Sequence, residues 1–183
     1  MKSTAKVPVH AIWLAQDDPK KNTAVKLSRR GDLRLHERFN QLPRKGIILE
    51  PLCGKVLGPE DHSLLLQDGG SLVGLDCSWA QIDESVNQVM KRTKLKGRML
   101  PLLLAANPVN WGKPSKLTTA EALAASLYLI GEEEHARKLL SAFNWGEQFF
   151  VLNNEPLEAY RGANSSSELV DLQFEFFNIE RPE

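Results

Sequence analysis

The 183-residue sequence has only two cysteines, Cys53 and Cys77, and they lie far apart. This argues against a disulfide framework and is typical of a reducing compartment, so we predict a cytoplasmic protein. Its four histidines lack the spacing of metal ligands, and we predict no metal. The apolar runs fall short of the roughly 20 residues that a membrane span needs, so we expect no membrane partner.

Several common catalytic motifs are also missing. The chain has no G-x-G-x-x-G, Walker, G-x-S-x-G or C-x-x-C pattern, so hydrolase and nucleoside-triphosphate chemistry have no support. Lys2 and Lys6 precede apolar residues, as in a signal peptide, but Pro8 and His10 interrupt the run. We therefore expect a first core strand there.

Charge is distributed unevenly, although the formal net charge is zero. Residues 1–116 hold 19 Lys or Arg against 11 Asp or Glu, whereas residues 117–183 hold 4 against 12. Residues 91–116 contain seven basic side chains and no acidic one. Such a segment indicates a polyanionic partner such as RNA or DNA, but a solvated surface balanced by the acidic half fits equally well.

Strand and helix patterns alternate along the first hundred residues. We predict strands over 7–15, 46–52 and 71–75 and helices over 23–30 and 82–92. A further short apolar segment covers 64–66. This alternation predicts a parallel sheet with crossover helices, and hence an α/β fold.

The later part of the chain has a different pattern. Four helices are predicted, over 120–130, 132–143, 145–160 and about 167–177, with no strand among them. The sequence thus predicts an N-terminal α/β domain over 1–99 and a mostly helical domain over 100–183. The second domain is expected to contribute the last strand of the sheet and a ligand-binding loop.

The segment 98–125 is the strongest candidate for a ligand site. Its continuous apolar run 102–106 predicts a buried strand, and the proline- and glycine-containing stretch 107–116 predicts a loop. Thr118 and Glu121 form a capping-box pattern that opens a helix. A loop between a strand end and a helix start is where α/β proteins bind ligands, with anionic groups favoured at the helix start.

A few side chains could carry chemistry. Asp76 follows a strand and is either a carboxylate at the sheet rim or the N-cap of the next helix. Trp79 is either an aromatic wall for a nucleobase or a sulfonium cation, or ordinary core packing. Thr118 and Thr119 could bind an anion or simply cap their own helix. Trp111 is expected to be half-buried, pinning its loop.

Longer stretches resemble one family. The segments LDCSW (75–79), RMLPLLLAANPVNWGKPSKLTTAEALAA (98–125) and FNWGEQFFVLNNEPLEAY (143–160) are similar to the small-subunit ribosomal-RNA aminocarboxypropyltransferases of archaea and eukaryotes. DDPKKNTAVKL (17–27) and GIILEP (46–51) match the N-terminal part of that family. The resemblance covers most of the chain in the right order.

The resemblance implies a fold and a reaction. It implies a SPOUT-like fold with a deep trefoil knot and S-adenosylmethionine as cofactor. The group transferred is the 3-amino-3-carboxypropyl group rather than the methyl. The acceptor is a pseudouridine, usually already methylated, in small-subunit ribosomal RNA, and the partner is the pre-ribosomal small subunit. We expect the protein to be a monomer.

It also implies roles for individual residues. The adenine is expected against the backbone near Leu100 and Ser115, and the ribose against the carbonyl of Leu75. The cofactor carboxylate is expected at Thr23 and at the helix start at Thr119. The apolar side chains around the adenine are Leu49, Leu117 and Ala122.

The expected catalytic residues are Trp79, which shields the methyl, and Asp76, which orients or deprotonates the acceptor imide. An ordinary Asp is a weak base at neutral pH, so orientation is expected to contribute more than proton transfer. The residues expected to contact RNA are Lys94, Lys96, Arg98, Lys116 and Lys138.

Some positions depart from the family pattern. The family often has a tyrosine where this chain has Ser115, so an aromatic wall is lost there while a backbone contact survives. Basic positions expected before the LDCSW segment have no match in EDHSLLLQDGG (60–70). Two alternatives stay open: a SPOUT-like RNA methyltransferase, and a non-catalytic RNA-binding ribosome-assembly factor.

Overall fold

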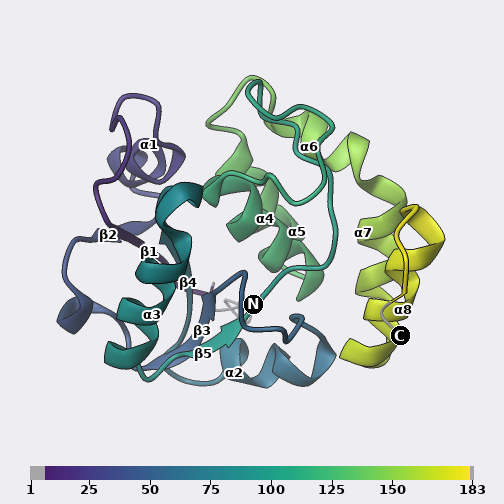
Figure 1. Cartoon of the computed structure of the whole chain (residues 1–183), viewed down its shortest axis with the longest axis horizontal. Coiled ribbons are helices and arrows are strands. Elements are labelled where there is room, and N and C mark those ends of the chain that lie inside the picture. The colour runs from purple at the N-terminus through teal and green to yellow at the C-terminus, as the bar shows by residue number, and fades with distance from the viewer. Residues whose placement is uncertain (1–6, 182–183) are drawn as a thin grey trace, which may run out of the picture.

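The strands of the computed structural model, which describes residues 7–181, form one parallel sheet. Their order is β2-β1-β4-β3-β5 (Figure 1). Their bounds are β1 Val9–Trp13, β2 Arg34–His36, β3 Lys45–Leu49, β4 Gly70–Asp76 and β5 Lys96–Arg98. The predicted α/β fold with a parallel sheet is confirmed, while the trefoil knot stays a prediction.

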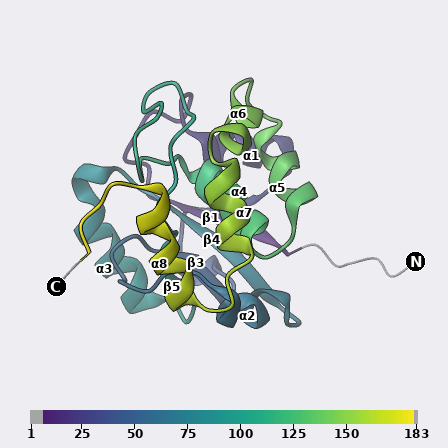
Figure 2. The same ribbon diagram turned by 90° about the vertical axis from the view of Figure 1, so that its right-hand side faces the viewer.

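The helices fall into two groups along the chain. The first three alternate with the strands, and the other five follow the last strand, with α7 and α8 on the side of the molecule away from β2 (Figures 1 and 2). Their bounds are α1 Thr23–Arg30, α2 His62–Leu66, α3 Ile82–Arg92, α4 Thr119–Leu129, α5 Glu133–Leu140, α6 Gly146–Leu152, α7 Asn154–Arg161 and α8 Ser166–Phe176. None of the described helices is long and apolar enough to cross a bilayer.

Apolar side chains alternate between the two faces of the sheet, as expected for buried parallel strands. Ile12, Ile48 and Val73 pack on one face with Val89 of α3. Their sequence neighbours pack on the opposite face in a larger cluster, which extends through α1, α2 and α4 to α8. One face of the sheet and the later helices therefore share one continuous core.

The predicted strand over 102–106 is wrong. Its backbone groups are instead hydrogen-bonded to side chains. The Asn153 side chain accepts from the Leu104 amide at 2.7 Å and donates to the Leu104 carbonyl at 2.9 Å. Gln173 accepts from the Leu102 amide, and Tyr160 donates to the Leu102 carbonyl. On its other side the segment pairs with its own returning loop. The last strand of the sheet is β5, which has no apolar residue to reveal it.

Asn153 also marks a break in a predicted helix. The predicted single helix over 145–160 is two helices, α6 and α7, which meet at Asn153. Asn153 is fully buried, and its side chain holds Leu104 while also donating to the Phe149 carbonyl at 2.9 Å. The apolar segment 64–66 belongs to helix α2, and β2 was not predicted.

Close contact between β4 and α4 depends on a glycine. A Cβ on Gly74 would lie 2.9 Å from Thr119 Cγ2, inside van der Waals contact. Gly74 therefore lets the first turn of α4 lie directly on the carboxyl end of β4. This contact places the start of α4 beside the sheet rim.

Two stacked histidines at the β1–β2 edge predict a loss of stability in acid. His10 Nδ1 lies 2.9 Å from His36 Nε2, and burial, aided by the charges of His36 and Arg34, lowers the pKa of His10 from 6.5 to about 4. The unfolded chain binds this proton near pH 6.5 and the folded chain does not, so stability falls as the pH drops from about 6.5 towards 4. We expect a loss of about 1 kcal/mol between pH 7 and 5, discounted for partial exposure. Urea unfolding measures it, and His10→Gln should reduce this pH dependence; an unchanged dependence would contradict the assignment.

Candidate active site

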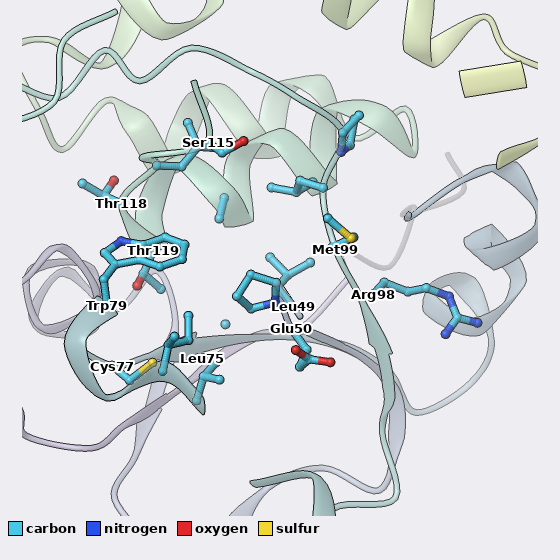
Figure 3. Close-up of a pocket in the computed structure, with 17 residues that line it drawn as sticks. Leu49, Glu50, Leu75, Cys77, Trp79, Arg98, Met99, Ser115, Thr118 and Thr119 are labelled. Carbon is cyan, nitrogen blue, oxygen red and sulfur yellow. The ribbon is translucent and has the colours of Figure 1, made fainter. Parts of the chain in front are cut away.

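A pocket opens where three neighbouring strands end. The carboxyl ends of β3, β4 and β5 line one side of the pocket. The loop after β5 and the first turn of α4 line the opposite side (Figure 3). Open parallel sheets bind ligands at this edge. The site predicted from segment 98–125 therefore coincides with a pocket of the structure, although 102–106 is no strand.

Most of the predicted cofactor residues meet in this pocket. Those that line it are Leu49, Leu75, Leu100, Ser115, Leu117, Thr119 and Ala122. They come from β3, β4, the loop and α4, so the fold brings together positions that are far apart in the sequence. Leu49 lies across the pocket from Ser115 (Figure 3).

Other lining residues were missed by the sequence reasoning. They are Glu50, Pro51, Gly74, Cys77, Ile82, Met99 and Pro101, whereas Thr118, named from the sequence as a possible anion-binding residue, also lines the pocket. Glu50 was placed inside the predicted strand 46–52, but β3 ends at Leu49, so Glu50 is the first residue after the strand, at the edge where ligands bind. Met99 follows β5, which has no apolar pattern to reveal it. Burial raises the pKa of the Cys77 thiol to about 11, so this thiol is neutral at physiological pH.

Glu121 holds the shape of the loop. Its side chain is fully buried, and its carboxylate accepts from the Ala106 amide at 2.7 Å, from the amide and side chain of Asn107 at 3.1 and 2.9 Å, and from the Thr118 amide at 2.7 Å and hydroxyl at 2.9 Å. The predicted capping box is thus confirmed. It also fixes both ends of the loop that closes the pocket.

The start of α4 offers fewer free amides than predicted. The Ala120 amide donates to Thr23 Oγ1 at 3.2 Å, and those of Glu121 and Ala122 donate to Thr118. Thr23 does not line the pocket and instead supports the first turn of α4 from behind. A carboxylate here would bind the Thr119 amide rather than a row of helix amides.

Asp76 lies behind the pocket wall. Its carboxylate accepts from Asn22 Nδ2 at 2.5 Å and from Thr119 Oγ1 at 2.9 Å, and only 6% of the residue is exposed. Burial raises the pKa of this carboxyl, partly offset by the two hydrogen bonds. The alternative of an N-cap for α3 is wrong, because α3 begins at Ile82 and Asp76 instead joins the starts of α1 and α4. Asp76 therefore orients Thr119.

Trp79 stands at the pocket wall with 49% of its surface exposed, which excludes ordinary core packing. Lys116 Nζ lies 5.0 Å from the centroid of its ring, a cation–π distance. The ring therefore contacts a cationic side chain of the loop and also lines the pocket. Trp111, which was expected to be half-buried, is 53% exposed and does not line the pocket.

Comparisons with known proteins agree on one family. Residues 47–177 match the family model "Ribosome biogenesis protein, C-terminal". The 16S rRNA aminocarboxypropyltransferase of Methanosarcina mazei is 43% identical over 91% of this chain and 93% of its own, and that of Methanothermobacter thermautotrophicus is 44% identical over 87% and 92%. This chain belongs to the 16S rRNA aminocarboxypropyltransferase family.

A solved structure supports the assignment to this aminocarboxypropyltransferase family. The SAM-dependent rRNA:acp-transferase Tsr3 from Vulcanisaeta distributa aligns with a TM-score of 0.79 and 35% identity. The alignment covers 94% of this chain and all of that one. The parallel sheet and the later helices are thus features of the family fold.

The basic residues of this aminocarboxypropyltransferase-family chain are not equivalent. Lys94, Lys96 and Lys116 are exposed, as an RNA contact requires. Lys138 is exposed on α5, and its Nζ lies 4.0 Å from Asp32 Oδ1. Arg98 instead lines the pocket and forms a buried ion pair, with its Nε 2.9 Å from Asp61 Oδ1.

The buried pair predicts that Arg98 supports the fold more than RNA binding. Arg98→Met should lower the free energy of unfolding by about 3 kcal/mol, because Asp61 is left as a buried unpaired charge. Lys96→Met, two residues away and exposed, should change it by less than about 0.5 kcal/mol. Denaturant unfolding of both variants gives the two free energies. Equal free energies of unfolding for the two variants would contradict the structural role of Arg98.

Proposed function

We propose that this protein transfers the 3-amino-3-carboxypropyl group of S-adenosylmethionine to a pseudouridine, N1-methylated beforehand, of small-subunit ribosomal RNA during ribosome biogenesis. The observation that carries the proposal is the convergence of seven predicted cofactor residues in one pocket at the sheet rim. The names of the relatives, which cover most of this chain, support the same reaction.

The pocket has a suitable wall for each part of the cofactor. Apolar side chains of Leu49, Leu117 and Ala122 would enclose the adenine, and the carbonyl of Leu75 would accept from the ribose hydroxyls. The carboxylate would bind at Thr119, in the first turn of α4 that the Thr23 hydroxyl supports. The ring of Trp79 would contact the sulfonium and its methyl, since aromatic faces attract cations.

The residues then select which group is transferred. A sulfonium has three carbon substituents, and the nucleophile attacks the one that faces it along the bond to be broken. With the methyl against Trp79 and the carboxylate at the start of α4, the γ-carbon of the amino-acid arm would face the pocket mouth. Attack by the acceptor imide nitrogen breaks the bond from this carbon to sulfur and leaves methylthioadenosine.

Isotope labels test the proposal directly. Small-subunit RNA is incubated with the protein and with S-adenosylmethionine labelled either in the methyl or in the carboxyl carbon. We expect carboxyl label in the RNA and methyl label in methylthioadenosine. Methyl label in the RNA would identify a methyltransferase, and no label from either position would identify a binding factor; both results contradict the proposal.

A further inference from the structure

The proposed acceptor must be ionised before it can react. The imide nitrogen of a pseudouridine carries a proton at neutral pH, and the lone pair that attacks carbon is free only after this proton leaves. The anion that results spreads its charge over the two neighbouring carbonyl oxygens. The site therefore needs a base to take the proton or a cation to stabilise the anion.

The carboxylates near the pocket are poorly placed as bases. Both oxygens of Asp76 accept hydrogen bonds, and the residue is buried behind Thr119. Glu50 is 4% exposed, accepts from the Leu52 amide at 2.6 Å, and lies across the pocket from Trp79 (Figure 3). Both carboxylates are therefore buried and already engaged as hydrogen-bond acceptors.

A cation does stand beside the pocket wall, on the loop residue between Ser115 and Leu117, which both line the pocket. Lys116 is exposed, and its ammonium lies over the ring of Trp79. Its backbone carbonyl accepts from Asn107 Nδ2 at 3.2 Å, and Asn107 is itself held by the buried Glu121. The backbone that carries Lys116 is thus fixed by the same network that shapes the pocket wall.

We infer that Lys116 stabilises the imidate anion of the acceptor base, in addition to any contact with RNA phosphate. This inference rests on the proposed function. The imide proton passes to solvent water, the nitrogen lone pair forms the bond to the γ-carbon, and the carbon–sulfur pair stays on sulfur as a neutral thioether. An ammonium a few ångströms from a carbonyl oxygen lowers the pKa of the imide, because it interacts with the anion and not with the neutral base.

The pH dependence of the reaction tests this role. With RNA and S-adenosylmethionine both saturating, kcat is measured from pH 6 to 10 for the wild type and for Lys116→Met. We expect the variant to lose about 10- to 100-fold at pH 7, to reach its plateau about one to two pH units higher, and to recover most of its rate there. Lys116→Arg should retain most of the wild-type rate because it keeps the positive charge.

A matched control comes from the same loop. Lys113 is exposed and its contacts within the loop are backbone hydrogen bonds, so Lys113→Met should keep the wild-type pH profile. A raised KM for RNA in Lys116→Met with an unshifted pH profile would overturn the inference and leave Lys116 as a phosphate contact. A weakened affinity for S-adenosylmethionine with no shift would also overturn it. Absence of methylthioadenosine release from the wild type at every pH would instead refute the proposed function.

Discussion

Replacing Glu121 with alanine is expected to lower the free energy of unfolding by roughly 3 to 5 kcal/mol. The carboxylate accepts five hydrogen bonds in a fully buried position, so its removal leaves the donors of Ala106, Asn107 and Thr118 without partners. The loop that closes the pocket should loosen as well. Denaturant unfolding gives the stability, and calorimetry should show at least about tenfold weaker binding of S-adenosylmethionine.

Helix α8 provides the control for this prediction. Glu168 occupies the same position after its N-cap Ser165, but it is exposed and accepts from the Asn164 amide at the surface. Glu168→Ala should lower the free energy of unfolding by about 1 kcal/mol or less and leave cofactor binding unchanged. Equal losses in the two variants would show that the buried network adds nothing beyond ordinary helix capping.

Replacing Trp79 with alanine is expected to have the largest effect on activity. The variant should bind S-adenosylmethionine about tenfold more weakly, because the ring no longer contacts the sulfonium. Its transfer rate should fall by about 100-fold, because the methyl is no longer held away from the acceptor. The free energy of unfolding should change by less than about 1 kcal/mol, since half of the ring is already exposed.

Trp111 is the matched control, because it is similarly exposed on the adjoining loop but does not line the pocket. Trp111→Ala should leave both the affinity for S-adenosylmethionine and the position of the transferred label unchanged. Equal effects of the two substitutions on cofactor binding would remove the role assigned to Trp79.

The sequence predicted those parts of the fold that local pattern specifies. Helices α1 and α4 have side-chain N-caps and α3 has an amphipathic repeat, and the starts of all three were placed within about two residues. Strand β5 could not be predicted, because Lys96–Arg98 has no apolar residue and becomes a strand only by pairing with β3. The segment 102–106 looks like a buried strand because it is buried, but its backbone partners are the distant side chains of Asn153, Gln173 and Tyr160.

The candidate site shows a similar division. The resemblance identified residues that line the pocket, because the spacing of a family motif carries that information without knowledge of the fold. The partners of Asp76 and Arg98 were not predictable, since Asn22 and Asp61 are distant in sequence and meet them only in the folded chain. The sequence therefore identified the pocket, but it did not reveal that Asp76 and Arg98 are already hydrogen-bonded to other side chains of the protein.

The most direct test of this account is a crystal structure of the protein with S-adenosylmethionine bound. We predict adenine between Leu49 and Leu117, the carboxylate at Thr119, the methyl against Trp79 and the γ-carbon of the amino-acid arm facing the mouth of the pocket. A cofactor bound elsewhere, or one with its methyl at the mouth and its amino-acid arm enclosed, would contradict the account.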